Sequence, residues 1–349
     1  MLDGTHASGV LCKILKSMRI AFMGATELGW NSCRTLFDTG QDVVGIFSIP
    51  QQFRISWSQT PVTNVQYRSF EDLAAEHSIP LVYVEGKMSD PVYASALRSM
   101  RPDIIIVVGW YYILPRSLRE LAPLGAAGLH ASLLPKYRGG APLVWATING
   151  EPETGVTFFH FADGVDDGDI IGQAKFSIDF ADDIASLVGK ASQASIKLLS
   201  DFVPMLADGT APRIRQDHSQ ATSVPQRKPE DGGINWRKLA AAQAYNWVRA
   251  QTRPYPGAFT FLRDEKVTIW RTAPDENSAA KDFSPGTIVR DSGDGFSVIC
   301  ADGNSLQIKE VGLAENPNMP AAEFAAAREL KTGMKFEVQP KDCGAVVHG

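Results

Sequence analysis

An unbroken run of β-branched residues, IIIVV at residues 104–108, constrains the fold most strongly. A strand that is buried on both faces has this composition, which is typical of the centre of a parallel sheet. We expect further strands at residues 18–24, 43–47, 80–84, 154–161 and 171–178, and helices at residues 70–77, 91–100, 141–149 and 184–206. This alternation predicts an α/β domain with a mostly parallel sheet.

The C-terminal part of the chain has a different pattern. Short β-rich runs alternate there with Asp/Gly turns, at residues 286–290, 296–300 and 305–311. Such spacing predicts a small β-barrel. We therefore divide the chain into a disordered extension (residues 1–17), the α/β domain (18–212), a linker (213–233), a connecting helix and hairpin (234–283) and a small C-terminal β-barrel (284–340).

Composition excludes several classes of protein. The 349 residues carry a net charge of -5 and are 44% hydrophobic, which is ordinary for a globular protein and argues against non-specific binding to nucleic acid. No apolar run is long enough to span a membrane. Cys12, Cys33, Cys300 and Cys343 show no CxxC spacing, so we expect no metal site, no disulfide framework and a reducing cytoplasm.

The turn after the first strand does not match a cofactor motif. Residues 24–29 read GATELG, which differs from the GxGxxG fingerprint of dinucleotide-binding proteins. We predict a tight structural turn there and no nicotinamide cofactor.

A histidine and an aspartate are the main candidates for chemistry. His130 stands where a strand should end, although a histidine in such a place is more often a core side chain. Asp166 lies in the loop DGVDDGD at residues 163–169, whose glycines can bend the chain back towards the sheet edge. A carboxylate held against an imidazole at that edge would form a proton-handling unit.

Two segments near this edge are candidates for ligand contact. The loop GWYYILP at residues 109–115 follows the central strand, and ligands of open α/β sheets bind beyond the carboxyl ends of the strands. Trp110 and Tyr111 either line such a site or pack against the next helix, and the sequence supports both readings equally. The helix expected at residues 141–149 follows two glycines, and its first N–H groups could bind an anion or a polar ligand edge.

Several motifs together resemble the formyltransferases that use 10-formyltetrahydrofolate. They are HASLLP (residues 130–135), RG (138–139), AP (141–142), TGVT (154–157), GVDDG (164–168), PEDG (229–232) and PYPGAF (254–259). The likeness extends from residue 18 to residue 336. It implies a Rossmann-like formyltransferase domain with a mostly parallel sheet, followed by a small barrel with an OB-like topology.

The resemblance also implies a chemistry. An amine attacks the formyl carbon, and the resulting oxyanion must be stabilised while a proton leaves nitrogen. His130 would move that proton or support the oxyanion, Asp166 would orient the imidazole, and Ser132 is the third catalytic candidate. The residues implied to bind 10-formyltetrahydrofolate, largely through backbone groups, are Tyr112, Ile113, Leu114, Ser132, Leu133, Leu134, Pro135, Gly140, Ala162, Asp163, Gly164, Val165 and Asp166.

One position departs from the family pattern. The family usually has Asn, an oxyanion donor, two residues before the histidine, where this chain has Gly128. Losing one such donor typically costs on the order of 10²–10³ in rate. A backbone N–H, a water or another side chain would have to substitute for it. Otherwise the activity differs, with hydrolysis of the formyl donor or folate binding without catalysis as the alternatives.

Two classes of amine acceptor fit the resemblance. Arg54 is the only cation between residues 45 and 67, which is too little for phosphate contacts to dominate, and residues 136–138 and Trp145 resemble the amino-sugar enzymes. We therefore expect a nucleotide-linked amino sugar as acceptor, with initiator methionyl-tRNA as the alternative. Aromatic residues near the C-terminal hairpin could form a homodimer surface, although core packing explains them equally well.

Overall fold

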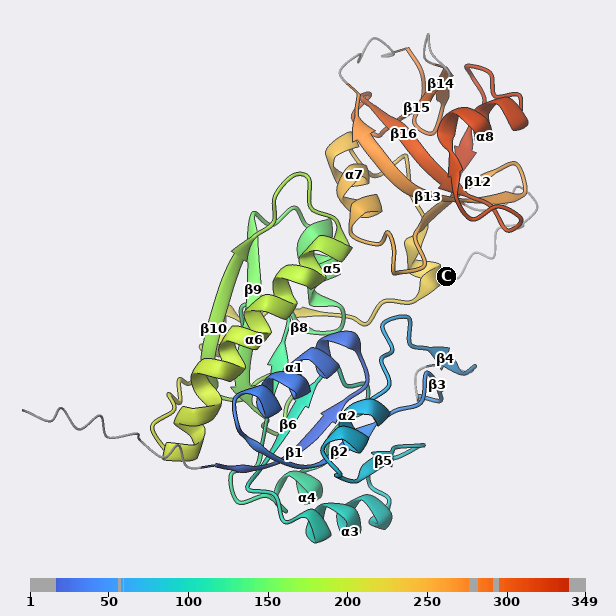
Figure 1. Cartoon of the computed structure of the whole chain (residues 1–349). Helices are drawn as coiled ribbons and strands as arrows, with labels where there is room; N and C mark the ends of the chain where they lie inside the picture. Colours follow the sequence, from blue (N-terminus) through green and yellow to red (C-terminus); the bar gives the residue numbers. More distant parts are fainter. Residues whose placement is uncertain (1–16, 56–57, 59, 276–281, 291–294, 339–349) are drawn as a thin grey trace, which may run out of the picture.

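The computed structural model describes residues 17–55, 58, 60–275, 282–290 and 295–338 (Figure 1). The extension predicted at residues 1–17 lies outside this part of the chain except for Ser17, as do Cys12 and Cys343. Cys33 and Cys300 are buried free thiols.

The first sheet has seven strands in the order β10-β9-β7-β6-β1-β2-β5. Its strands are β1 (Arg19–Gly24), β2 (Asp42–Ser48), β5 (Leu81–Tyr83), β6 (Ile104–Val108), β7 (Ala126–His130), β9 (Glu153–His160) and β10 (Ile170–Ser177). The pairs from β5 to β7 are parallel, whereas β9 is antiparallel to both of its neighbours. The apolar run at residues 104–108 is buried throughout, between β1 and β7, which confirms the mostly parallel α/β sheet.

Helices cover both faces of this sheet. One face packs against α1 (Glu27–Asp38), α2 (Glu71–Glu76) and α6 (Ile184–Asp208), and the other against α3 (Pro91–Met100) and α4 (Arg116–Arg119). The long helix α6 begins with a capping box in which the side chains of Asp183 and Ser186 each bind the other residue's backbone N–H. The remaining elements of this unit are the two-residue strands β3 (Gln52–Phe53), β4 (Val62–Thr63) and β8 (Arg138–Gly139), and the short helix α5 (Pro142–Ile148).

The C-terminal unit is a second, antiparallel sheet that forms a small barrel. Its strand order is β14-β15-β16-β13-β12-β18, with β17 paired to β16. The strands are β12 (Ala258–Leu262), β13 (Glu265–Pro274), β14 (Ile288–Arg290), β15 (Phe296–Ile299), β16 (Ser305–Gly312), β17 (Met319–Pro320) and β18 (Phe336–Glu337). We predicted a hairpin within a connecting segment at residues 234–283. This hairpin, β12 and β13, belongs to the same sheet as the later strands. The core holds Trp236, Phe296, Phe324 and Phe336.

The segment between the two sheets is folded onto the first unit. It contains the 3-10 helices η1 (His218–Gln220) and η2 (Pro229–Gly232), and the strand β11 (Ser223–Val224). Strand β11 pairs in parallel with β8, and helix α7 (Ala241–Arg249) follows. The sequence predicted a linker at residues 213–233, but it did not predict that part of this linker pairs with β8.

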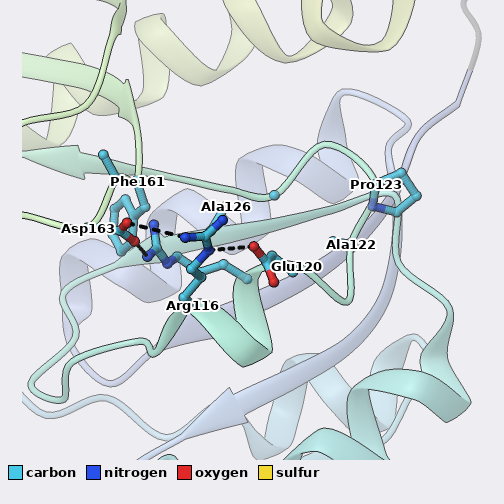
Figure 2. Close-up of a pocket in the computed structure, with 10 residues that line it drawn as sticks. Arg116, Glu120, Ala122, Pro123, Ala126, Phe161 and Asp163 are labelled. Atoms are coloured by element: carbon cyan, nitrogen blue, oxygen red, sulfur yellow. Dashed lines mark hydrogen bonds and ion pairs between the residues drawn. The ribbon is translucent and has the colours of Figure 1, made fainter.

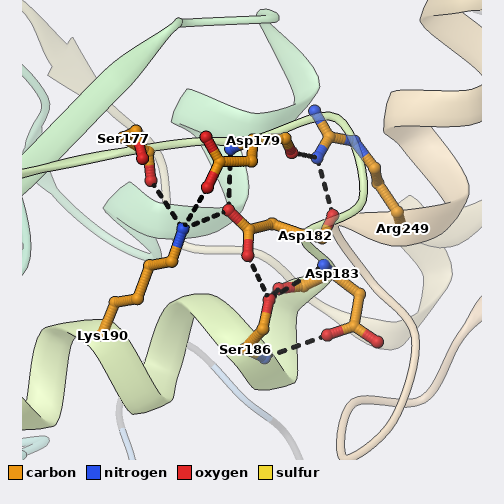
Figure 3. A network of polar contacts seen from close by, with 7 residues as sticks. All are labelled: Ser177, Asp179, Asp182, Asp183, Ser186, Lys190 and Arg249. Atoms are coloured by element: carbon orange, nitrogen blue, oxygen red, sulfur yellow. Dashed lines mark hydrogen bonds and ion pairs between the residues drawn. The ribbon is translucent and has the colours of Figure 1, made fainter.

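A polar network joins α7 to the start of α6 (Figure 3). Arg249 Nη1 donates to the main-chain oxygens of Asp179 at 2.9 Å and of Asp182 at 2.6 Å. Lys190 Nζ lies 2.9 Å from the carboxylate of Asp179 and 2.6 Å from that of Asp182. The turn before α6 is thus fixed to both helices. Within the described residues, no helix is both long and apolar enough to cross a bilayer.

Candidate active site

The last residue of β7, His130, is nine-tenths buried and faces an acceptor on each side of its ring. Its Nε2 lies 2.7 Å from the carbonyl oxygen of Tyr137, and its Nδ1 lies 3.5 Å from Oδ2 of Asp166. A carbonyl oxygen can only accept, so Nε2 carries a proton in this arrangement. The structure thus brings together the two residues singled out in the sequence, while their catalytic role stays a prediction.

Asp166 has an uncommon backbone conformation, and its carboxylate is held by β8. Its φ of 51° lies in the left-handed region, and its Oδ2 accepts from the N–H of Gly139 at 2.8 Å. Gly168 allows the loop to return, because a Cβ there would lie 1.8 Å from the carbonyl oxygen of His160. The bend expected from the glycines therefore depends on a specific close approach.

The loop after His130 is fixed by hydroxyl groups. Ser132 Oγ donates to the carbonyl oxygen of Lys136 at 2.7 Å, and the serine is fully buried. Thr157 Oγ1 donates to Ser132 O at 2.7 Å and accepts from the N–H of Leu134 at 3.0 Å. These bonds make Ser132 a support of the loop, and its role in catalysis is untested.

A pocket of about 440 Å³ lies between α4 and the start of the loop that carries Asp166 (Figure 2). It is lined by Arg116, Arg119, Glu120, Ala122, Pro123, Gly125, Ala126, Phe161, Ala162 and Asp163. Two of the predicted folate-binding residues, Ala162 and Asp163, are therefore in its wall. Leu114 packs in the same core cluster as Ala122 and Ala126, but Ile113 is 87% exposed.

Two arginines in this pocket were not predicted. Arg119 Nη2 donates to Asp163 Oδ1 at 2.6 Å, and Arg116 lies 3.7 Å from the same carboxylate. Arg119 is nine-tenths buried, and no described residue accepts a hydrogen bond from its Nε. A buried guanidinium with an unused donor favours a further acceptor. The sequence RSLRE at residues 116–120 reads as an ordinary polar helix, so it carried no signal of this placement.

The space beside Gly128 is filled. A Cβ built on Gly128 would lie 2.6 Å from the ring of Phe161 and 2.6 Å from the carbonyl oxygen of Val107. A side chain that replaced this glycine would meet a backbone atom and an aromatic ring. Phe161 thus occupies the position into which an asparagine side chain would extend.

The aromatic loop after β6 packs internally. Tyr111 OH donates to Asn64 Oδ1 at 2.9 Å, and its ring contacts Phe53. Burial raises the pKa of Tyr111 above its ordinary value, so this phenol stays neutral. Tyr112 OH donates to the main-chain oxygen of Arg54 at 2.9 Å. The sequence offered packing against the next helix as the alternative to ligand contact, but these contacts of Tyr111 are with Asn64 and with Phe53 on β3. Ligand contact by Trp110 and Tyr111 stays a prediction.

Within the described residues, neither His160 nor any cluster of potential metal ligands indicates a second site. Burial, together with the nearby Arg213, lowers the pKa of His160 and keeps its imidazole neutral. Among the residues that the structure describes, no group of three or more His, Cys, Asp or Glu side chains could hold a metal ion.

A mostly parallel α/β sheet with a buried His/Asp pair at the end of β7, followed by a small antiparallel barrel, is typical of a two-part α/β enzyme. Residues 18–203 match the model of the formyl transferase family, and residues 227–329 match its C-terminal domain. The chain belongs to the formyl transferase family and is a formyl-transferring enzyme.

Curated relatives agree over nearly the whole chain. The methionyl-tRNA formyltransferase of Citrifermentans bemidjiense is 36% identical over 91% of this chain and 96% of its own. That of Geobacter sulfurreducens is 34% identical over 96% of this chain and 100% of its own.

Solved structures share the fold at lower identity. The sugar 3N-formyl transferase WlaRD covers 83% of this chain and 97% of its own, with a TM-score of 0.60 and 17% identity. The methionyl-tRNA formyltransferase of Clostridium thermocellum covers 74% of this chain and 95% of its own, with a TM-score of 0.50 and 18% identity. HypX from Aquifex aeolicus has a TM-score of 0.58 and 18% identity, and this chain spans about half of it, 47%.

The expectation of an amino-sugar acceptor is wrong. Five curated relatives, at 33% to 36% identity over most of the chain, are all methionyl-tRNA formyltransferases. Residues that suggested the amino sugar have structural roles instead. Arg138 donates to the side chain of Gln216, and Trp145 donates to Pro225 O and packs its ring on Arg227. These contacts account for Arg138 and Trp145 without an acceptor.

Proposed function

We propose that this enzyme transfers the formyl group of 10-formyltetrahydrofolate to the amino group of methionyl-tRNA. The proposal is carried by relatives of that activity that match this chain at 33% to 36% identity along at least 90% of its length. A low count of cations in the segment between residues 45 and 67 does not argue against it, since phosphate contacts can come from other parts of the surface.

The donor is proposed from the fold and the pocket. Structural neighbours were solved with tetrahydrofolic acid and with folinic acid. The pocket beside Phe161 combines small apolar side chains with the Arg119–Asp163 pair. An aromatic ring for stacking, a cation and a carboxylate complement a flat heterocycle that carries both donors and acceptors. We propose that Ala162 and Asp163, which line this pocket, are among the contacts of the folate.

His130 is proposed to carry the proton between the two nitrogens. When the amine attacks the formyl carbon, its nitrogen must lose a proton, and the folate nitrogen must gain one as the carbon–nitrogen bond breaks. With Nδ1 facing Asp166, the ring uses Nε2, which exchanges its contact with the Tyr137 carbonyl for the reacting groups. Nε2 takes the proton that the attacking nitrogen loses and gives it to the folate nitrogen as the carbon–nitrogen bond breaks. While the ring carries this proton, it supports the oxyanion. Asp166, 3.5 Å from Nδ1, keeps the ring oriented through these steps.

Replacing either member of the pair tests the assignment. We expect His130→Ala and Asp166→Asn to lower the single-turnover rate of formyl-methionyl-tRNA formation by roughly 10²–10⁴-fold, the usual size of a general acid–base contribution. Asp201→Asn, an exposed aspartate on α6, is the matched control and should retain the wild-type rate. A folded His130→Ala variant with a rate near that of the wild type would remove His130 from the mechanism.

A further inference from the structure

Gln216 is a buried polar residue in an otherwise exposed segment. It lies in the part of the chain that the sequence predicted to be a linker, and it is 4% exposed, whereas Arg215 and Asp217 beside it are exposed. Its amide makes hydrogen bonds through both ends. Nε2 donates to the main-chain oxygens of Asp166 at 2.9 Å and of Gly168 at 2.7 Å.

These two bonds hold the loop that presents the Asp166 carboxylate. Asp166 has a left-handed φ, a conformation that costs a residue with a Cβ free energy and needs support from its surroundings. Gln216 supplies that support, because one amide group binds the carbonyls on both sides of Asp167. Without it, two buried or half-buried carbonyl oxygens would lose their donor, and the loop could relax towards a commoner conformation.

Gln216 is itself fixed by β8. Arg138 donates from Nε at 3.2 Å and from Nη2 at 2.5 Å to Gln216 Oε1. This leaves Nε2 pointing at the loop, which assigns the orientation of the amide. The neighbouring residue of β8, Gly139, gives its N–H to the carboxylate of Asp166.

The same linker sets the position of β8. The N–H of Arg138 donates to Thr222 O at 2.9 Å, and that of Gly140 donates to Val224 O at 3.1 Å. A Cβ on Gly139 would lie 2.4 Å from Val224 O, so the two backbones approach as closely as glycine allows. The linker therefore fixes Asp166 twice, through Gln216 at its main chain and through β8 at its carboxylate.

We propose that Gln216 is a positioning residue for formyl transfer, which holds the Asp166 carboxylate against His130 from the segment that joins the two units. The inference rests on the proposed function, because it requires His130 and Asp166 to be the reacting pair. The hydrogen bonds of Gln216 go to Arg138, Asp166 and Gly168, so its effect on His130 acts through the loop at Asp166.

The test compares Gln216→Met, which keeps the length of the side chain but removes its donor, with Gln220→Ala, an exposed glutamine of the same linker. We expect Gln216→Met to lower kcat by on the order of 10²-fold, as for a misplaced reacting group, with KM for both substrates within about twofold of wild type. Gln220→Ala should match the wild type. If Gln216→Met does not fold, Gln216→Glu, which keeps the size of the side chain and its acceptors for Arg138, takes its place.

A spectroscopic readout separates positioning from loss of stability. In the folded, substrate-free variant, the ring N–H resonance of His130, assigned by its absence in His130→Ala, should shift or broaden in ¹H–¹⁵N spectra. An unchanged resonance, or a loss of activity that appears in KM or in melting temperature alone, would overturn the proposal. His130→Ala is assayed in parallel: if it stays active, the assignment of His130 and Asp166 as the reacting pair fails, whereas an inactive His130→Ala beside a fully active Gln216→Met refutes only the role of Gln216.

Discussion

At the scale of single residues, His130 and Asp166 are held by groups that come from separate loops: the carbonyl of Tyr137 faces the histidine, and the N–H of Gly139 binds the carboxylate. A histidine before a turn and an aspartate in a glycine-spaced loop were enough to predict that the two meet. No sequence pattern predicted the contact between His130 Nε2 and the carbonyl of Tyr137, or the hydrogen bond from Arg119 to Asp163. Both depend on where a loop folds back in space, and no periodicity records that.

Gly128 provides a test at this scale. We expect Gly128→Ala to destabilise the protein by about 1–3 kcal/mol, the usual cost of overpacking, because its Cβ would meet both Phe161 and Val107 O. Phe161→Ala in the same chain should recover part of this loss. Gly189→Ala is the control, since a Cβ in that part of α6 meets nothing within 4 Å and should be neutral or stabilising. Equal melting temperatures for the Gly128→Ala and Gly189→Ala variants would contradict the packing account.

At the scale of elements, periodicity located most helices and strands. The helix at residues 91–100 begins and ends as expected, because Asp90 caps it, Pro91 opens it and a left-handed Arg101 ends it. Helix α8 (Ala321–Ala327) was missed, since the short run AAEFAAA has no side-chain cap. The pairing of β11 with β8 was also missed, because two-residue strands leave no pattern and their partner lies far away in the chain.

An ion pair between α8 and the barrel gives a prediction on pH. Arg328, which follows α8, donates to both carboxylate oxygens of Glu265 on β13, and this lowers the pKa of Glu265 below its ordinary value. A depressed carboxyl pKa stabilises the fold above the unfolded-state value, near 4.3, and this stabilisation is lost as the pH falls through the folded-state value.

We therefore expect Glu265→Gln to lower the free energy of unfolding at pH 7 by no more than about 1 kcal/mol, because the pair is partly exposed. The loss should appear as a lower melting temperature. The difference from wild type should shrink at pH 4 and below. The exposed Glu323 on α8, changed to Gln, serves as the control. A deficit that is the same at pH 7 and at pH 3 would show that the Arg328 pair does not cause it.

At the scale of the whole molecule, the two units are fastened at the same place where the active site is supported. The guanidinium of Arg227 lies between the rings of Trp145 on α5 and Trp247 on α7, 4.9 Å and 5.0 Å from their centroids. Arg249 ties α7 to the turn before α6. Since the linker also carries Gln216, the joint between the units and the His130/Asp166 pair form one connected structure. The linker thus connects the two units and also supports the loop of Asp166, a role that its composition did not predict.

The proposed acceptor, methionyl-tRNA, can be tested by measuring the release of tetrahydrofolate. Release of tetrahydrofolate from 10-formyltetrahydrofolate is followed with no acceptor, with methionyl-tRNA, and with a panel of nucleotide-linked amino sugars as the comparison. We predict acceleration by methionyl-tRNA alone, with one formyl group appearing on its amino group for each tetrahydrofolate released, and loss of this acceleration in His130→Ala. Release that is equally fast without an acceptor, or acceleration by an amino sugar in place of methionyl-tRNA, would show that methionyl-tRNA is not the acceptor of the formyl group.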